Sequence, residues 1–253
     1  MNVLQRMKNA FKDYFIYSAQ QREFLSLKNR DYSKIGLSNA TQKASEIVQE
    51  NAERIYGNRW NYYSNALNRE VLETFEKSIE ILRKDYRLID YLEIGSCQGI
   101  SMSAIGLILD LQHIRGKLVS IDPYFEQGYK EGSRSVLGKK MQLKIDKRTK
   151  NQAIKLYEMC GLDVEIKEMI SLEALTALIG NKSKFHLIFI DGSHETLNPV
   201  LDFGLSCVSL YCGGIIMLDD HHWPDVKVIK SLCDEHCEKV HESWKIAAYR
   251  IKL

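Results

Sequence analysis

An α/β fold with a doubly wound, mostly parallel sheet is predicted for this chain of 253 residues by three observations. From about residue 89 onward, short apolar runs alternate with helical stretches, which is the pattern of strand–helix–strand units. The runs at 187–190 and 214–218 are apolar along their length, as strands covered on both faces of a sheet are. Both runs end in carboxylates, and open α/β folds bind ligands at the carboxyl ends of their strands.

The individual elements follow from the same patterns. We expect strands at residues 90–94, 117–121, 164–169, 187–190 and 214–218, followed by a final strand at 244–251. Helices should fill the intervals, with the clearest candidates at 99–111, 153–160 and 226–237. The sheet should therefore contain about six strands, or seven if a very short one lies near 238–242.

The first third of the chain has helical periodicity. Apolar residues within 44–56 recur at intervals of three and four, and Gly57 ends the pattern as a C-cap would. Residues 67–82 form a second amphipathic pattern. The polar-aromatic stretch 58–65 between them suits either a pocket lining or packing between the two helices. We divide the chain into a helical extension, 1–85, and an α/β domain, 86–253.

Composition narrows the classes of function. The apolar fraction of 45% and the charged fraction of 27% are those of an ordinary globular protein, and a net charge of +2 argues against nucleic acid as a partner. The first 20 residues carry charges among their apolar residues, so they lack the pattern of a signal peptide, and no run reaches membrane-spanning length. The six cysteines then suit a reducing compartment. We expect a cytoplasmic protein without a membrane partner.

Two acidic strand ends lie early in the predicted sheet. Glu93 ends the first strand and is followed by Gly95, Ser96 and Gly99, whose glycines allow the backbone to pass close to a ligand. This loop departs from the G-x-G-x-x-G dinucleotide fingerprint. Asp122 ends the second strand, where an acid is placed to bind a ribose diol.

Two further strand ends predict a cation site. Asp191 and His194 follow one apolar run, and Asp219 and Asp220 follow the next. Carboxylates from neighbouring strands are suited to a hard cation. As an alternative, the last two acids could cap a helix that starts near residue 224.

In this order the motifs resemble the class I S-adenosylmethionine-dependent methyltransferases. The motifs at Asp191–His194 and Asp219–His222 are similar to those of the metal-dependent O-methyltransferase branch, which includes catechol-type enzymes and sugar or macrolide O-methyltransferases. The branch also includes a family of relatives assigned as hydroxylases of cephalosporin pathways. The resemblance covers roughly residues 85–253 and implies a Rossmann-like fold.

The resemblance also implies roles for single residues. Gly95, Ser96 and Gly99 would approach the methionine portion of S-adenosylmethionine, Glu93 its amino group, and Asp122 the ribose hydroxyls. Ile170 and Ser171 occupy the position where the family contacts adenine. Asp191 is counted among the catalytic, the cofactor-binding and the metal-binding residues.

The metal ligands implied by the resemblance are Asp191, Asp219 and Asp220, with His194 as the catalytic base. Catechol-type enzymes have Asn and Lys where this chain has Asp220 and His194, so magnesium is expected and manganese is an alternative. A divalent ion chelated by a vicinal diol would orient the attacking hydroxyl and lower its pKa. The implied reaction is O-methylation of a sugar or another small natural-product acceptor.

Several alternatives remain open at this point. His221 or His222 could point into the pocket as a second base or ligand. Cys233, Cys237 and His241 would share one face of a helix, which leaves zinc conceivable although small buried thiols are the more frequent meaning.

The class of activity also has alternatives. These are hydroxylation, binding without turnover, and RNA methylation supported only by the basic run 139–150. An aromatic-rich helical extension is compatible with a homo-oligomer.

Overall fold

The computed structural model describes residues 36–57, 67–125, 129–130, 144–194 and 197–252. It contains a seven-stranded sheet in the order β5-β2-β1-β6-β7-β9-β8. These strands are β1 (Tyr91–Ile94), β2 (Leu118–Ile121), β5 (Val164–Lys167), β6 (Phe185–Ile190), β7 (Leu210–Leu218), β8 (Glu238–Glu242) and β9 (Ala247–Arg250). Strands β5, β2, β1, β6 and β7 pair in parallel, and the β8–β9 hairpin joins β7 antiparallel. The predicted α/β class is confirmed, with the seventh strand at the short segment named as an option.

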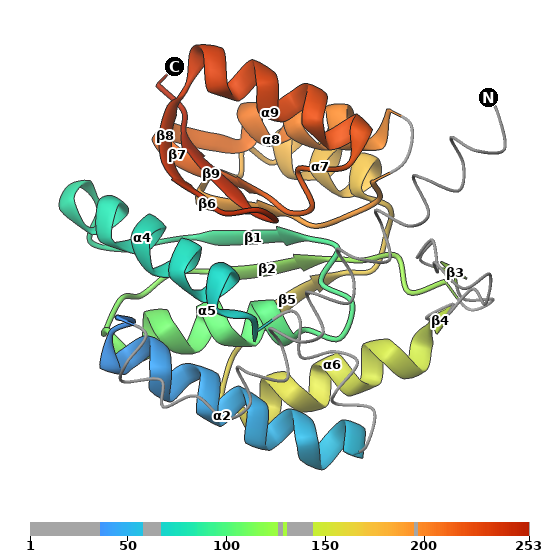
Figure 1. The fold of residues 1–253 in the computed structure, drawn as a ribbon. Helices are drawn as coiled ribbons and strands as arrows, with labels where there is room; N and C mark the ends of the chain where they lie inside the picture. The colour runs from blue at the N-terminus through green and yellow to red at the C-terminus, as the bar shows by residue number, and fades with distance from the viewer. Residues whose placement is uncertain (1–35, 58–66, 126–128, 131–143, 195–196, 253) are drawn as a thin grey trace, which may run out of the picture.

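Helices cover both faces of the sheet (Figure 1). One face carries α4 (Arg69–Asp85), α5 (Ile100–Leu111) and α6 (Lys147–Met159), and the other carries α7 (Ser171–Gly180), α8 (Asn198–Ser209) and α9 (Pro224–His236). Successive side chains of each strand point to opposite faces of the sheet and pack into two separate hydrophobic cores. In β1, for example, Tyr91 packs with α4 and α5, whereas Leu92 and Ile94 pack on the opposite side. The fold is therefore an α/β, Rossmann-like three-layer arrangement.

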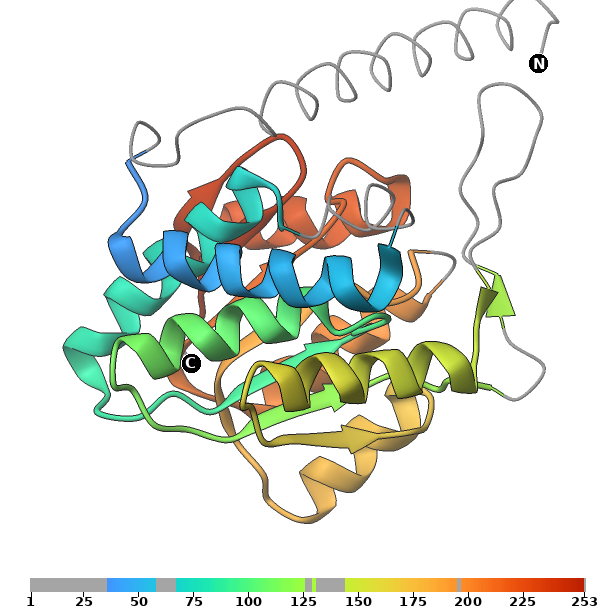
Figure 2. The ribbon, with the colours of Figure 1, turned by 90° about the horizontal axis from the view of Figure 1, so that it is seen from below.

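The N-terminal helix α2 (Asn39–Tyr56) lies along the outside of α5 and beside α6, as Figure 2 shows from below. It begins at the N-cap Ser38, whose hydroxyl accepts the backbone N–H of Thr41. Its buried residues Ala44, Val48 and Ala52 belong to the same core as α4 and α5. The boundary at residue 85 stays a prediction, and the described part of the extension shares its core with the α/β domain.

Some predicted bounds needed correction. Helix α6 begins several residues before 153, because Asp146 forms a capping box with Thr149. The basic run 139–150 therefore supplies the first turn of α6, where Lys147 and Lys150 pair with Glu168; residues 139–143 lie outside the described residues. The final strand is shorter than 244–251, since residues 243–246 form the turn between β8 and β9.

Two further features complete the described architecture. Strands β3 (Tyr129–Lys130) and β4 (Lys144–Ile145) form a small antiparallel pair after β2. The aromatic stretch 58–65 and the N-terminal residues 1–35 lie outside the described residues. None of the described helices combines the length and apolar character needed to cross a bilayer.

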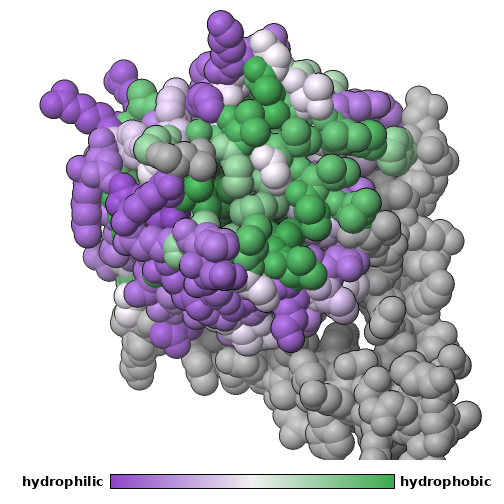
Figure 3. Space-filling model, turned by 90° about the horizontal axis from the view of Figure 1, so that it is seen from above, coloured by the Kyte–Doolittle hydropathy of each residue, from purple (hydrophilic) through white to green (hydrophobic). Residues whose placement is uncertain are grey.

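The outer face of α7, α8 and α9 is unusually apolar (Figure 3). Its exposed side chains include Leu172, Val200, Leu201, Val208, Val228 and Leu232. Single exposed apolar residues are normal, whereas a gathering of them distinguishes this face from the charged surface around it.

Candidate active site

The polar strand ends meet at one edge of the sheet. Ile94 is in register with Ile121 of β2 and with Ile190 of β6, which is in register with Leu218 of β7. The residues that directly follow these strands are therefore neighbours, as parallel strands require. Below, the glycine loop means residues 95–99, and the acidic edge means Asp191, Asp219 and Asp220.

The two loop glycines make room for the protein's own groups. Gly95 has φ +89°, and a Cβ atom on it would lie 2.0 Å from the backbone oxygen of Asp191. Gly99 has φ +74°, and a Cβ atom there would lie 2.5 Å from the ring of Tyr157. Both positions therefore require glycine for internal reasons. Their approach to a ligand stays a prediction.

Glu93 lies fully buried beneath the glycine loop. Its carboxylate accepts hydrogen bonds from the hydroxyl of Tyr91 at 2.9 Å and from that of Ser101, in the first turn of α5, at 2.5 Å. Burial raises the pKa of Glu93 to about 7, against the opposing effect of these two hydrogen bonds. The carboxylate thus fastens α5 to β1, and its predicted contact with an amino group stays untested.

Asp122 is also fully buried and joins β2 to the glycine loop. Its carboxylate accepts the backbone N–H of Cys97 at 2.9 Å and that of Tyr124 at 3.2 Å. The hydroxyl of Tyr124 in turn donates to the backbone oxygen of Cys97 at 2.7 Å. Cys97 and Tyr124 have φ angles of 45° and 38°, an uncommon conformation for residues other than glycine. Strained backbone of this kind is concentrated at functional sites.

Tyrosine hydroxyls around the loop were not foreseen from the sequence. Tyr56, at the end of α2, donates to the backbone oxygen of Gln98 at 2.9 Å. Ser96, a predicted cofactor contact, is buried and lies within hydrogen-bonding distance of Ser120 (2.5 Å) and of the Tyr124 hydroxyl (3.3 Å). These tyrosines are far apart in the sequence, so no spacing signal could have grouped them.

Ser171 is the first residue of α7 and follows Ile170, whose side chain is exposed. Burial raises the pKa of Asp202 of α8 to about 6, against the opposing effect of a hydrogen bond with the Ser171 hydroxyl. The predicted adenine contact stays untested, and the described partner of Ser171 is an internal carboxyl group.

At the ends of β6 and β7, the structure brings together Asp191, His194 and Asp219. One ligand atom from each lies within 4.8 Å of the others. His194 Nε2 lies 3.9 Å from Asp191 Oδ1. Asp220 follows with φ 46° and is not part of this three-residue group. Its predicted role as a third ligand stays untested.

Lys245 is the site residue that sequence reasoning missed. Its Nζ lies 2.7 Å from Asp219 Oδ2 and 3.9 Å from Asp220 Oδ1. Burial lowers the pKa of Lys245, but the surrounding carboxylates outweigh this effect and raise it overall. Burial alone would raise the pKa of Asp219, which Lys245 lowers below its usual range. The signal was weak because Lys245 lies in a hairpin turn, 25 residues beyond Asp220.

The burial of the acidic edge also acts on its other members. Burial and the negative charge of Asp219 raise the pKa of Asp191 well above its usual value. Burial raises the pKa of Asp220 as well, with Asp219 adding to the effect. Positive charge at this edge would oppose both shifts.

The paired histidines have different surroundings. His221 is buried, and its ring Nε2 lies 2.7 Å from the backbone oxygen of Ser243. Its backbone N–H donates to the backbone oxygen of Lys245. His222 stacks on Trp244 with ring centroids 5.3 Å apart. His221 thus holds the β8–β9 turn against the start of α9.

Two alternatives can now be corrected. Helix α9 has Trp223 as its N-cap and no side-chain capping bond, so the capping explanation for Asp219 and Asp220 is wrong. The common helix face proposed for a zinc site is also wrong. Helix α9 ends at His236, whereas His241 lies in β8 with its Nδ1 2.9 Å from Thr74 Oγ1.

The donor set of the acidic edge fits a divalent cation. Oxygen ligands converge there, and Asp219 Oδ1 is buried without a hydrogen-bond partner in the part of the chain that the structure describes. Burying a carboxylate oxygen without a hydrogen-bond donor costs free energy unless a bound cation supplies the missing interaction. Asp191 and Asp219 would hold the ion directly.

Comparison with known proteins agrees with this fold. A family model described as "Methyltransferase domain" matches residues 92–221, about half of the chain, so the chain belongs to the methyltransferase-domain family. Among curated proteins, no relative matches the sequence.

Solved structures resemble the fold at low sequence identity. The O-methyltransferase NovP has a TM-score of 0.58 at 11% identity, covering 85% of this chain and all of its own. An O-methyltransferase from Bacillus cereus in complex with SAH has a TM-score of 0.52 at 15% identity, and the match covers 87% of this chain and 94% of the other. CalS11, a TDP-rhamnose 3′-O-methyltransferase, has a TM-score of 0.51 at 12% identity, and the match covers 81% of this chain and 93% of the other. At such identities, these likenesses show a shared methyltransferase fold.

Proposed function

We propose that the chain is an S-adenosylmethionine-dependent O-methyltransferase that uses a divalent metal ion, magnesium or manganese, to methylate a hydroxyl of a sugar or another small diol-bearing acceptor. One observation carries the proposal: Asp191, His194 and Asp219 converge beside the glycine loop, and Asp219 Oδ1 is buried without a partner among the described residues. The similarity to CalS11, which acts on a sugar nucleotide, supports a sugar hydroxyl as the acceptor group.

The cofactor half of the proposal rests on the ends of β1 and β2. The loop from Gly95 to Gly99 and the carboxylate of Asp122 would hold the cofactor, as the family pattern implies. Through Ser101, Glu93 ties β1 to the first turn of α5, on either side of this loop. When bound, the cofactor would supply a methyl group activated by a sulfonium sulfur, for in-line transfer to the acceptor oxygen with the sulfur leaving as a neutral thioether.

The catalytic half rests on the ends of β6 and β7. Asp191, Asp219 and Asp220 would hold the ion, which supplies Lewis acidity to an acceptor oxygen. His194, with Nε2 3.9 Å from Asp191, would take the proton of the acceptor hydroxyl. Trp223, whose ring centroid lies 5.5 Å from that of His194, would limit access of water to the base.

The compartment and the assembly state are also proposals. Cys160, Cys207, Cys233 and Cys237 are free thiols, which supports the cytoplasm. The expectation of a homo-oligomer stays a prediction.

Mass spectrometry of a reaction mixture tests the activity. The full chain is incubated with S-adenosylmethionine, Mg²⁺ or Mn²⁺, and a panel of sugar nucleotides and catechols. We expect S-adenosylhomocysteine and a methylated acceptor, both abolished by EDTA. A hydroxylated product without methylation would favour the hydroxylase alternative, and failure to bind S-adenosylmethionine in calorimetry would overturn the proposal.

A further inference from the structure

Lys245 places an ammonium group directly against the acidic edge. Its Nζ pairs with Asp219 Oδ2 at 2.7 Å, and only 18% of its side chain is exposed. The second oxygen of the same carboxylate, Asp219 Oδ1, is left without a partner among the described residues. Lys245 therefore satisfies half of Asp219 and leaves the other half for a different donor or cation.

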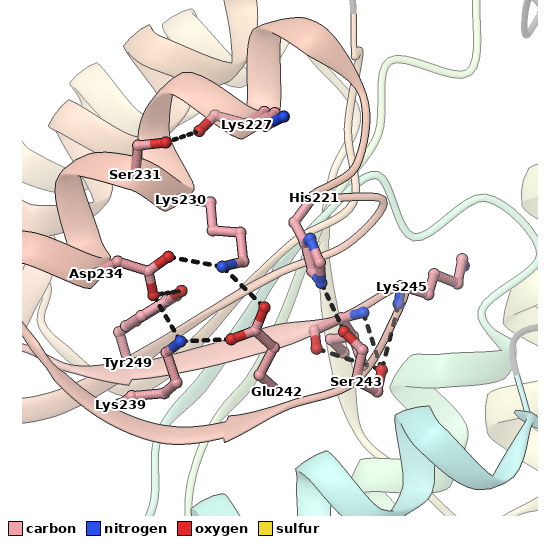
Figure 4. A network of polar contacts seen from close by, with 11 residues as sticks. His221, Lys227, Lys230, Ser231, Asp234, Lys239, Glu242, Ser243, Lys245 and Tyr249 are labelled. Atoms are coloured by element: carbon pink, nitrogen blue, oxygen red, sulfur yellow. Dashed lines mark hydrogen bonds and ion pairs between the residues drawn. The ribbon is translucent and has the colours of Figure 1, made fainter.

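The turn that carries Lys245 is held in place (Figure 4). The backbone N–H of His221 donates to the backbone oxygen of Lys245 at 3.1 Å, and the hydroxyl oxygen of Ser243 accepts the backbone N–H of Lys245 at 3.3 Å. The backbone is thus fixed while the four-carbon side chain retains its rotatable bonds. The ammonium can withdraw from the acidic edge without moving the hairpin.

The charges at this edge do not balance. Three carboxylates face one ammonium, so a divalent ion is a better electrostatic complement than Lys245 alone. An ion bound to Asp219 would lie next to the ammonium, since both would contact the same carboxylate. Like charges at that separation repel strongly in a buried site, so the two cations compete.

We propose that Lys245 is the internal counter-ion of the acidic edge in the metal-free protein and that it withdraws when a divalent ion binds. It thereby weakens metal binding and stabilises the metal-free fold. This inference rests on the metal site of the proposed function. It adds a residue that sets metal affinity.

The first test is Mn²⁺ binding to the full chain, measured by calorimetry or by electron paramagnetic resonance of free Mn²⁺. Lys245→Met should bind Mn²⁺ at least about tenfold more tightly than the wild type, because the competing charge is gone. Lys230→Met is the matched control. Lys230, on α9, has 15% of its side chain exposed and pairs with Asp234 at 2.6 Å and with Glu242 at 2.8 Å, in a network between α9 and the β8–β9 hairpin. Its variant should bind Mn²⁺ like the wild type.

The second readout is thermal unfolding in EDTA and with Mn²⁺. Lys245→Met should have a lower Tm than the wild type in EDTA and should gain more from Mn²⁺. Lys245→Gln, which keeps hydrogen-bonding capacity without charge, serves if the methionine variant does not fold.

Two results would overturn the inference, and they are distinguishable. Equal Mn²⁺ affinity in the wild type and Lys245→Met would refute the role of Lys245 while leaving the metal site intact. Absence of Mn²⁺ binding in both proteins would refute the metal-assisted function and the inference with it.

Discussion

The two halves of the candidate site handle buried negative charge in different ways. At the ends of β1 and β2, Glu93 and Asp122 accept hydrogen bonds from hydroxyl and backbone N–H groups of the chain itself. At the ends of β6 and β7, the carboxylates face one another, with Lys245 as a counter-charge. The first half is satisfied by neutral donors, whereas the second depends on cations.

Because of this difference, the glycine loop is held by fixed contacts, whereas the acidic edge can exchange one bound cation for another. Neutral hydroxyl and backbone N–H donors of the chain itself satisfy Glu93 and Asp122, so these contacts need no added ion. A carboxylate cluster that relies on a cation responds to which cation is present. We therefore expect substitutions at the acidic edge to change metal binding and catalysis, and substitutions near the glycine loop to change stability first.

The largest effect should come from Asp219→Asn. This change removes a charged ligand at the centre of the acidic edge, so Mn²⁺ binding should be lost and kcat/KM should fall by about a thousandfold or more. Calorimetry and product formation measure the two effects. Asp163→Asn, an exposed acid ahead of β5, should alter neither. Wild-type metal binding in Asp219→Asn would remove the distinction between the two halves.

His194→Gln should lower kcat by about 10²–10³-fold while leaving Mn²⁺ affinity close to that of the wild type. The reason is that the proposal assigns proton removal to His194 and ion binding to the three acids. Calorimetry beside steady-state kinetics separates the roles. If the variant lost Mn²⁺ binding, His194 would be a ligand, as its place in the group with Asp191 and Asp219 also allows.

Gly99→Ala should destabilise the protein by about 2–4 kcal/mol, since its φ of +74° is unfavourable for alanine and the new Cβ would meet the Tyr157 ring. Gly161→Ala is the matched control, because its φ is +70° and its Cβ would meet nothing within 4 Å. That variant should lose only about 1–2 kcal/mol. Denaturant unfolding gives both values. Equal losses would mean that Tyr157 does not brace the loop.

The smallest effect concerns pH. The pKa of Glu93 is about 7 in the folded chain against an ordinary value of 4.5, so the folded state binds this proton more tightly. Its contribution to stability is present below pH 4.5 and is lost as pH rises through 7. Wild type should therefore lose about 1–3 kcal/mol more than Glu93→Gln between pH 5 and 8. Parallel pH profiles in urea unfolding would show that Glu93 does not titrate in this range.

Much of the fold could be predicted because it depends on local patterns. The apolar runs that become β2, β6 and β7 are each followed directly by an acid, and Glu93 lies near the end of β1, so these acids had to lie at the strand ends. The start of α6 was missed because the capping box at Asp146 lies inside a basic run that resembles a solvated surface. The zinc alternative was wrong because it continued the helix as far as His241, whereas α9 ends at His236 and His241 lies in β8.

The sequence by itself determined the α/β class and which strands end in acids. It also predicted that Asp191 and Asp219 lie side by side, because each of them directly follows a strand. Only the tertiary structure decided that Lys245 pairs with Asp219, that Tyr56 and Tyr124 support the glycine loop, and that His221 anchors a turn. These contacts join residues separated by 22 or more positions. No periodicity encodes such pairs, and they form only when packing of the whole sheet brings its edges together.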